Sequence, residues 1–132
     1  RWIVFTTLRV LTDDPFEALE DCIDVGFDRI LTSGQQPRAA GGAELIGELI
    51  KKAGGRISIM PGSGVNEDTV MEIVSKTGAK EIHCSAAINV ESIMKFRNEN
   101  IQEMGSEKGS AFTTLTVDPL RIRKIRELAE SC

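Results

Sequence analysis

Met60 and His83 are two side chains that soft metal ions bind, and each stands at the end of a segment with a strand-like pattern. Thioether, thiol and imidazole groups are the ligands that suit soft metal ions, so the neighbouring Cys84 is a third candidate. Adjacent residues on a strand point to opposite faces, and Cys84 could therefore join the other two only where a bulge breaks the alternation. The alternatives are a structural core histidine and a small buried thiol. Because no tight cysteine and histidine spacing is present, the pattern alone predicts a metal site only weakly.

A second candidate site is the glycine turn at 61–64, which ends a strand and is followed by Asn66 as a helix cap. Backbone N–H groups and the helix dipole point at one spot in such a turn, which is how many proteins bind phosphate and other anions. An ordinary connection between a strand and a helix has the same composition and stays open as the alternative. The residues of this candidate anion site are Gly62, Ser63, Gly64 and Ser85.

Strands and helices alternate along the chain and must position these residues. Strand-like segments are expected at 2–5, 27–34, 56–60 and 80–86, and amphipathic helices at 15–25, 43–53, 67–77 and 118–131. This alternation predicts a parallel sheet with right-handed crossovers. The isoleucines of each strand are expected to face the helices, together with Cys84. The residues expected on the opposite face, toward an interior lumen, are Thr6, Ser33, Met60, His83 and Ser85.

Strands with one apolar and one mixed face favour a TIM (βα)8-barrel over an open doubly wound sheet. A full barrel needs about 250 residues, whereas this chain has 132. We therefore predict a single α/β domain over residues 1–132 that corresponds to four βα units, half of a barrel with two open sheet edges. Residues 87–117 are expected to form an irregular loop with a short helix at 90–96. The strand-like start at Arg1, without a preceding methionine, suggests a truncated chain.

Charged residues on the predicted elements give two further expectations. Arg29 and Glu81 both fall early in their strands on the lumen side, where they are expected to form a structural ion pair. The last helix carries four cations that are expected on a solvated face: Arg121, Arg123, Lys124 and Arg126.

Composition excludes several classes of function. The net charge of −4 argues against nonspecific nucleic-acid binding, and 5% aromatic residues leave little for a base-stacking platform. No apolar run approaches the roughly 20 residues of a membrane span. Cys22, Cys84 and Cys132 are widely spaced and odd in number, which predicts reduced thiols and a cytoplasmic protein.

Several long motifs make the chain similar to the copper-homeostasis CutC family. They are Asp14-Pro15, Gly26 to Gly34, Gly42 to Ile46, Gly55 to Gly62, His83 to Ala86 and Met94 to Asn98. The resemblance covers nearly the whole chain in order. It implies the C-terminal half of a βα-barrel about twice as long and a role in cytoplasmic copper handling. In that register the turn at 61–64 follows the seventh barrel strand and Ser85 the eighth, and the loops there often bind phosphate.

Three departures from the family pattern remove polar groups from one rim of the predicted barrel. The family's His-Arg-Ala-Phe-Asp motif corresponds to Thr6 to Val10 here, the third glycine of its Pro-Gly-Gly-Gly turn is Ser63, and an arginine is replaced by Ala87.

Three hypotheses follow for the function. We favour a copper-binding protein without turnover, in which copper(I) meets His83, Met60 and, if the alternation breaks, Cys84. The alternatives are a barrel enzyme acting on a small anionic or phosphorylated ligand, and a degraded half-barrel that survives by homo-oligomerisation over its open edges.

Overall fold

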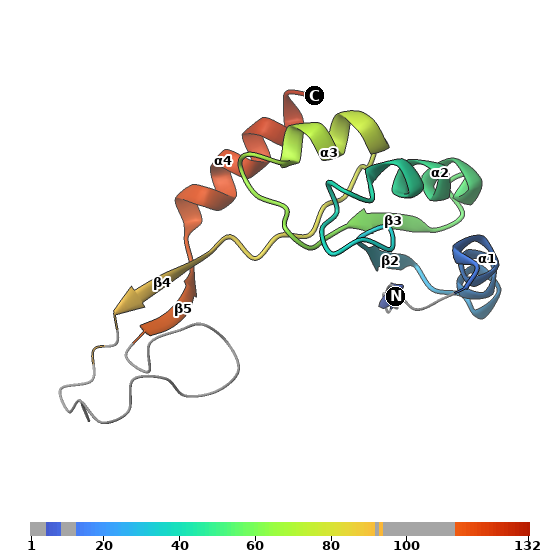
Figure 1. Cartoon of the computed structure of the whole chain (residues 1–132), viewed down its shortest axis with the longest axis horizontal. Coiled ribbons are helices and arrows are strands. Elements are labelled where there is room, and N and C mark those ends of the chain that lie inside the picture. Colours follow the sequence, from blue (N-terminus) through green and yellow to red (C-terminus); the bar gives the residue numbers. More distant parts are fainter. Residues whose placement is uncertain (1–4, 9–12, 92, 94–112) are drawn as a thin grey trace.

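A parallel sheet covered by helices on one face forms the centre of the molecule (Figure 1). The computed structural model describes residues 5–8, 13–91, 93 and 113–132. The sheet has the order β1 (Phe5–Leu8), β2 (Arg29–Thr32) and β3 (Ser58–Pro61). Each strand is followed by a helix: α1 (Pro15–Val25), α2 (Ala43–Ala53) and α3 (Val70–Thr77). The expected α/β class with parallel strands is confirmed, while the barrel stays a prediction.

Local sequence signals set the limits of α1. The carboxylate of Asp14 accepts the N–H groups of Phe16 at 2.8 Å and Glu17 at 3.2 Å, and Pro15 occupies the first helical position. Gly26 ends the helix with φ +88°, a left-handed conformation that favours glycine. These boundaries agree with the prediction.

Alternation along β2 and β3 separates a helix-facing side from an open side. Ile30 and Ile59 are buried under the helices, whereas Leu31 and Met60 are only partly buried. Side chains from all three covering helices complete the core, which includes Leu19, Ile46, Leu49, Val70 and Ile73. The sequence-based assignment of the two faces is confirmed for β2 and β3. The side chains of β1, including Thr6, and residues 9 and 10 lie outside what the structure describes.

The predicted strand at 80–86 is wrong. This segment has no strand pairing within the described part of the chain, and one backbone hydrogen bond joins it to β3, from His83 N–H to Pro61 O at 2.9 Å. Its alternation nevertheless holds, because Ile82 and Cys84 pack against the core while His83 and Ser85 are exposed. The side-chain pattern was therefore read correctly, although the ladder does not form.

The expected start of the third helix at residue 67 is also wrong, since α3 begins at Val70. The Asn66 side chain accepts the N–H groups of Asp68 at 2.9 Å and Thr69 at 3.2 Å, and the Thr69 hydroxyl accepts Asn66 N–H at 3.1 Å. This reciprocal pair resembles a capping box, but it closes a turn ahead of the helix.

Residues 87–117 are not an irregular loop throughout. Strands β4 (Ala87–Glu91) and β5 (Thr113–Val117) form an antiparallel ribbon that extends away from the sheet and helices (Figure 1). The short helix expected at 90–96 is wrong at residues 90 and 91, which belong to β4, and its other residues except 93 lie outside the described part of the chain.

Helix α4 (Pro119–Glu130) closes the described chain as predicted. Asp118 caps it by accepting Leu120 N–H at 2.8 Å, and Pro119 takes the first helical position. The helix lies against α3 and buries Ile125, whose side chain is 2% exposed. Across the described ranges, no helix has both the length and the hydrophobicity that crossing a bilayer requires.

Candidate functional site

Met60 and His83 both lie on the side of the sheet that the helices leave uncovered. Met60 is partly buried on the open side of β3, and His83 is exposed beside the turn that follows this strand. Residue 62 is two positions beyond Met60 and shares its face. A Cβ atom placed on Gly62 would lie 2.4 Å from Leu31 Cδ1 and 3.3 Å from His83 Cβ. The imidazole therefore stands next to the carboxyl end of β3, and glycine permits this close approach.

Backbone hydrogen bonds fix this corner. His83 N–H donates to Pro61 O at 2.9 Å, and Gly62 N–H donates to Thr32 O at 2.9 Å. These two bonds hold the histidine's segment against β3 and the turn against β2. The exposed imidazole of His83 therefore lies near the carboxyl end of the strand that carries the partly buried Met60. A thioether and an imidazole are ligands that suit a soft metal ion.

Cys84 is not brought together with Met60 and His83. It packs against the core and lines a cavity of about 340 Å³ between α3 and α4, together with Val74 and Ile125. Among the residues that the structure describes, no group of three or more His, Cys, Asp or Glu side chains could hold a metal ion. The predicted ligands are therefore divided between two faces of the sheet.

The turn at 62–64 uses much of its hydrogen-bonding capacity inside the fold. The Ser63 hydroxyl donates to Pro37 O at 2.7 Å, and Ser63 O accepts Ala39 N–H at 2.9 Å. Ser63 and Gly64 have φ values of +76° and +70°, a left-handed conformation that is unusual for serine. Since Gly62 N–H is also bonded, two donors of the predicted anion site are already satisfied, and Ser85 is exposed nearby on the following segment.

Arg38 is a cation at this turn that the sequence did not single out. A Cβ atom on Gly64 would lie 3.1 Å from both Cγ and Cδ of Arg38, so the exposed arginine side chain passes directly over the turn. Arg38 lies in a polar loop, where no strand or helix periodicity distinguishes one residue from the next. The pair of an arginine and a glycine turn favours negatively charged ligands.

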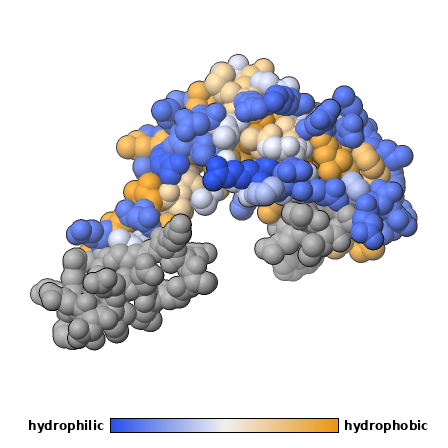
Figure 2. Space-filling view, viewed as in Figure 1, coloured by the Kyte–Doolittle hydropathy of each residue, from blue (hydrophilic) through white to orange (hydrophobic). Residues whose placement is uncertain are grey.

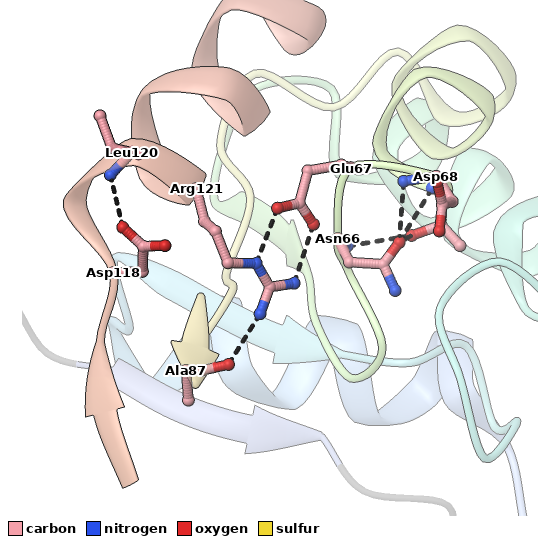
Figure 3. A network of polar contacts seen from close by, with 8 residues as sticks. Asn66, Glu67, Asp68, Ala87, Asp118, Leu120 and Arg121 are labelled. Carbon is pink, nitrogen blue, oxygen red and sulfur yellow. Dashed lines mark hydrogen bonds and ion pairs between the residues drawn. The ribbon is translucent and has the colours of Figure 1, made fainter. Parts of the chain in front are cut away.

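Arg121 connects α4 to the loop after β3. Its Nε and Nη2 donate to Glu67 at 2.7 and 2.8 Å, and its Nη1 donates to Ala87 O at 2.7 Å (Figure 3). The hydrogen bonds from Arg121 lower the pKa of the Glu67 carboxyl to about 2. The expectation that Arg121 lies on a solvated face is therefore wrong, whereas Arg123, Lys124 and Arg126 are exposed as predicted.

The Arg29–Glu81 ion pair is confirmed, with Nε and Oε2 separated by 2.6 Å. The hydrogen bond from Arg29 lowers the pKa of the Glu81 carboxyl. A cavity of about 550 Å³ at this amino-terminal end is lined by Ile50, Ile57 and Ala79 among others. This cavity lies at the end of β3 opposite to His83, so the presence of a cavity does not by itself mark the predicted site.

Comparisons with known proteins agree on one family. The model described as the CutC family matches residues 5–88. A CutC family protein of Parabacteroides distasonis is 51% identical over 110 residues, which cover 83% of this chain and 45% of the relative. Relatives named copper homeostasis protein cutC homolog in mouse and human are 38% and 37% identical, covering 91% and 92% of this chain and 44% of each relative.

A solved structure supports the same assignment. The CutC protein of Streptococcus agalactiae superimposes with a TM-score of 0.52 at 27% identity, over 58% of this chain and 40% of that one. The chain therefore spans less than half the length of the relatives that it matches. Since the family model matches residues 5–88 of 132, the chain belongs to the CutC family.

Proposed function

We propose that this protein acts in copper homeostasis by binding copper(I) as cargo in the cytoplasm. The single observation that supports the proposal is that His83 lies beside Gly62, two residues beyond the partly buried Met60 of β3. The names of the mouse and human relatives support copper as the ion. Copper(I) can be bound by a small number of soft ligands, and a thioether with an imidazole forms such a set.

The proposed ligand set is Met60 with His83 and excludes Cys84. The thiol packs against the core on the helix side, whereas the neighbouring His83 points to the opposite side of the same extended segment. Because the exposed His83 and the partly buried Met60 would hold the ion without an enclosed cage, the site favours uptake and transfer over permanent retention. The proposed role is binding without turnover.

A competition assay tests the proposal. The protein is titrated against a chromogenic copper(I) chelator under anaerobic, reducing conditions, in a Cys132→Ser background that removes the exposed thiol. We expect submicromolar binding of one copper(I), with the affinity lowered at least tenfold by either His83→Ala or Met60→Leu. The matched control is Met71→Leu, which changes an exposed methionine on α3. Equal affinities in all of these proteins would reject the site.

A second candidate function is action on a small anionic or phosphorylated ligand at the turn 62–64. The position of Arg38 over Gly64 favours it, and the hydrogen bonds already made by Gly62 and Ser63 weigh against it. Titration with inorganic phosphate, followed through the amide signals of Ser63 and Gly64, distinguishes the two functions. Saturable shifts that disappear in Arg38→Gln would support the anion site, and unchanged signals would reject it.

A further inference from the structure

Arg121 differs from most charged residues on the surface of the helices. Hydrophilic residues cover much of the visible surface (Figure 2), so a charged side chain does not by itself indicate a function. The Arg121 side chain is 32% exposed, and its guanidinium lies between the Glu67 carboxylate and the carbonyl group of Ala87 (Figure 3). Its neighbours Arg123 and Lys124 on α4 are exposed. The function of Arg121 is therefore to be sought in the two segments that it joins.

One of these segments carries His83 and is held at its end by the start of α4. Asp118 N–H donates to Ala86 O at 3.1 Å, just beyond the histidine. Arg121 Nη1 donates to the next carbonyl group, Ala87 O, at 2.7 Å. Ala86 is buried and has φ +44°, a left-handed conformation that is strained for alanine. The two hydrogen bonds from α4 hold the backbone in this conformation and so fix the end of the histidine's segment.

The other segment is the loop that follows β3 and carries Glu67. The Thr69 hydroxyl donates to Gly64 O at 2.9 Å, which closes this loop around Glu67 and ties it to the glycine turn. The Glu67 side chain is 18% exposed. Two parallel hydrogen bonds between a guanidinium and a carboxylate fix their orientation as well as their distance. Arg121 therefore holds the loop after β3 and the histidine's segment in one arrangement.

We infer that Arg121 is a positioning residue of the copper(I) site, which fixes His83 relative to Met60; this role rests on the proposed function. A chain of bonds runs from β3 through Glu67 and Arg121 to the end of the histidine's segment. The bond from His83 N–H to Pro61 O returns to β3 and closes the ring. A closed ring leaves the imidazole few positions relative to the thioether, which lowers the cost of bringing both ligands to one ion.

The charge of Arg121 opposes copper binding, and this separates a positioning role from an electrostatic one. A nearby cation repels copper(I), so loss of the charge alone would raise the copper affinity. Loss of the positioning contacts would lower the copper affinity, because the histidine's segment would move. Arg121→Gln removes both the charge and the contacts, so the two effects have opposite signs. Arg121→Lys keeps the charge but cannot make the three hydrogen bonds of a planar guanidinium.

The copper(I) competition assay in the Cys132→Ser background gives the first measurement. We expect Arg121→Gln and Arg121→Lys each to lower the copper affinity about tenfold, as loss of a residue that orients a ligand does. The matched control is Arg56→Gln, since Arg56 also makes a two-bond pair, with Glu20 at 2.7 and 2.8 Å, and donates to Ala53 O at 3.0 Å. This control should leave the copper affinity unchanged, and circular dichroism verifies that each variant is folded.

Amide hydrogen exchange without copper gives the second measurement. The His83 N–H should exchange about tenfold faster in Arg121→Gln and Arg121→Lys, because local opening becomes easier. The Ser58 N–H, which donates to Asp28 O at 3.0 Å at the other end of β3, should exchange at the parent rate. Unchanged exchange at His83 would overturn the inference, and so would unchanged or raised affinity in a chain that binds copper. A parent chain that binds no copper rejects the proposed function instead, and the exchange rate then decides whether Arg121 positions His83.

Discussion

The packing of α4 on the rest of the molecule gives a prediction that two isoleucines of the same helix test directly. Ile125 is 2% exposed and belongs to the core, whereas Ile122 is 43% exposed. Both are changed to alanine. The gain in helix propensity is the same for the two changes, so the difference between them reports packing alone.

The expected loss in the free energy of unfolding follows from how deeply each side chain is buried. Ile125→Ala removes three buried carbon atoms at about 0.8 kcal/mol each and leaves a cavity, which gives a loss of about 3 kcal/mol in the free energy of unfolding. Ile122→Ala removes half-exposed atoms and leaves no closed cavity, so a loss of about 1 kcal/mol or less is expected. For a chain of this size, these losses correspond to decreases in Tm of about 10 °C and about 3 °C.

Urea denaturation followed by circular dichroism measures both losses. Equal losses in the two variants would refute the packing of α4 through Ile125. A larger loss for Ile122→Ala would refute it as well.

Three further predictions concern a carboxylate, a helix cap and a glycine. The folded pKa of Glu67, about 2, lies below its ordinary 4.5, so the stability from its pair with Arg121 is full above about pH 4.5 and is lost as the pH falls toward 2. Urea denaturation at several pH values should show that the free energy of unfolding of Arg121→Gln depends less steeply on pH between 2 and 4.5. The same dependence in both proteins would contradict the pairing. Asp14→Ala should lower the free energy of unfolding measured with urea by about 1 kcal/mol. A loss below about 0.3 kcal/mol would contradict the assignment of Asp14 as the helix cap. Gly62→Ala should displace His83 and lower copper(I) affinity in the competition assay while the chain stays folded; retained affinity would contradict the close approach.

The sequence predicted best those features that depend on local chemistry. Asp14 with Pro15 and Asp118 with Pro119 mark helix starts because the cap and the proline act within one turn. The alternation of Ile82 and Cys84 with His83 and Ser85 identified the correct faces because side-chain direction follows the backbone. That Met60 and His83 together form a site stays a prediction.

The errors arose where the fold depends on distant partners. Residues 80–86 carry strand-like residues, yet a ladder needs paired backbone groups and only the bond from His83 N–H to Pro61 O is made to β3. The ribbon pairs Ala87 with Val117 across a long stretch of sequence, so no short period could reveal it, although Thr113–Val117 is rich in β-branched residues. Arg121 was assigned to solvent because its partner Glu67 lies 54 residues away in the chain.

The claim that matters most is that Met60 and His83 bind copper(I) together on the open side of the sheet. The most direct measurement is a copper(I) titration of protein labelled at the methionine methyl groups and the histidine ring, followed by NMR. The chain has four methionines and one histidine, so variants can assign every signal. We predict that the Met60 methyl and His83 ring signals shift together and saturate at one equivalent of copper. Saturation that shifts a different methionine, or that leaves the His83 ring unchanged, would contradict the claim.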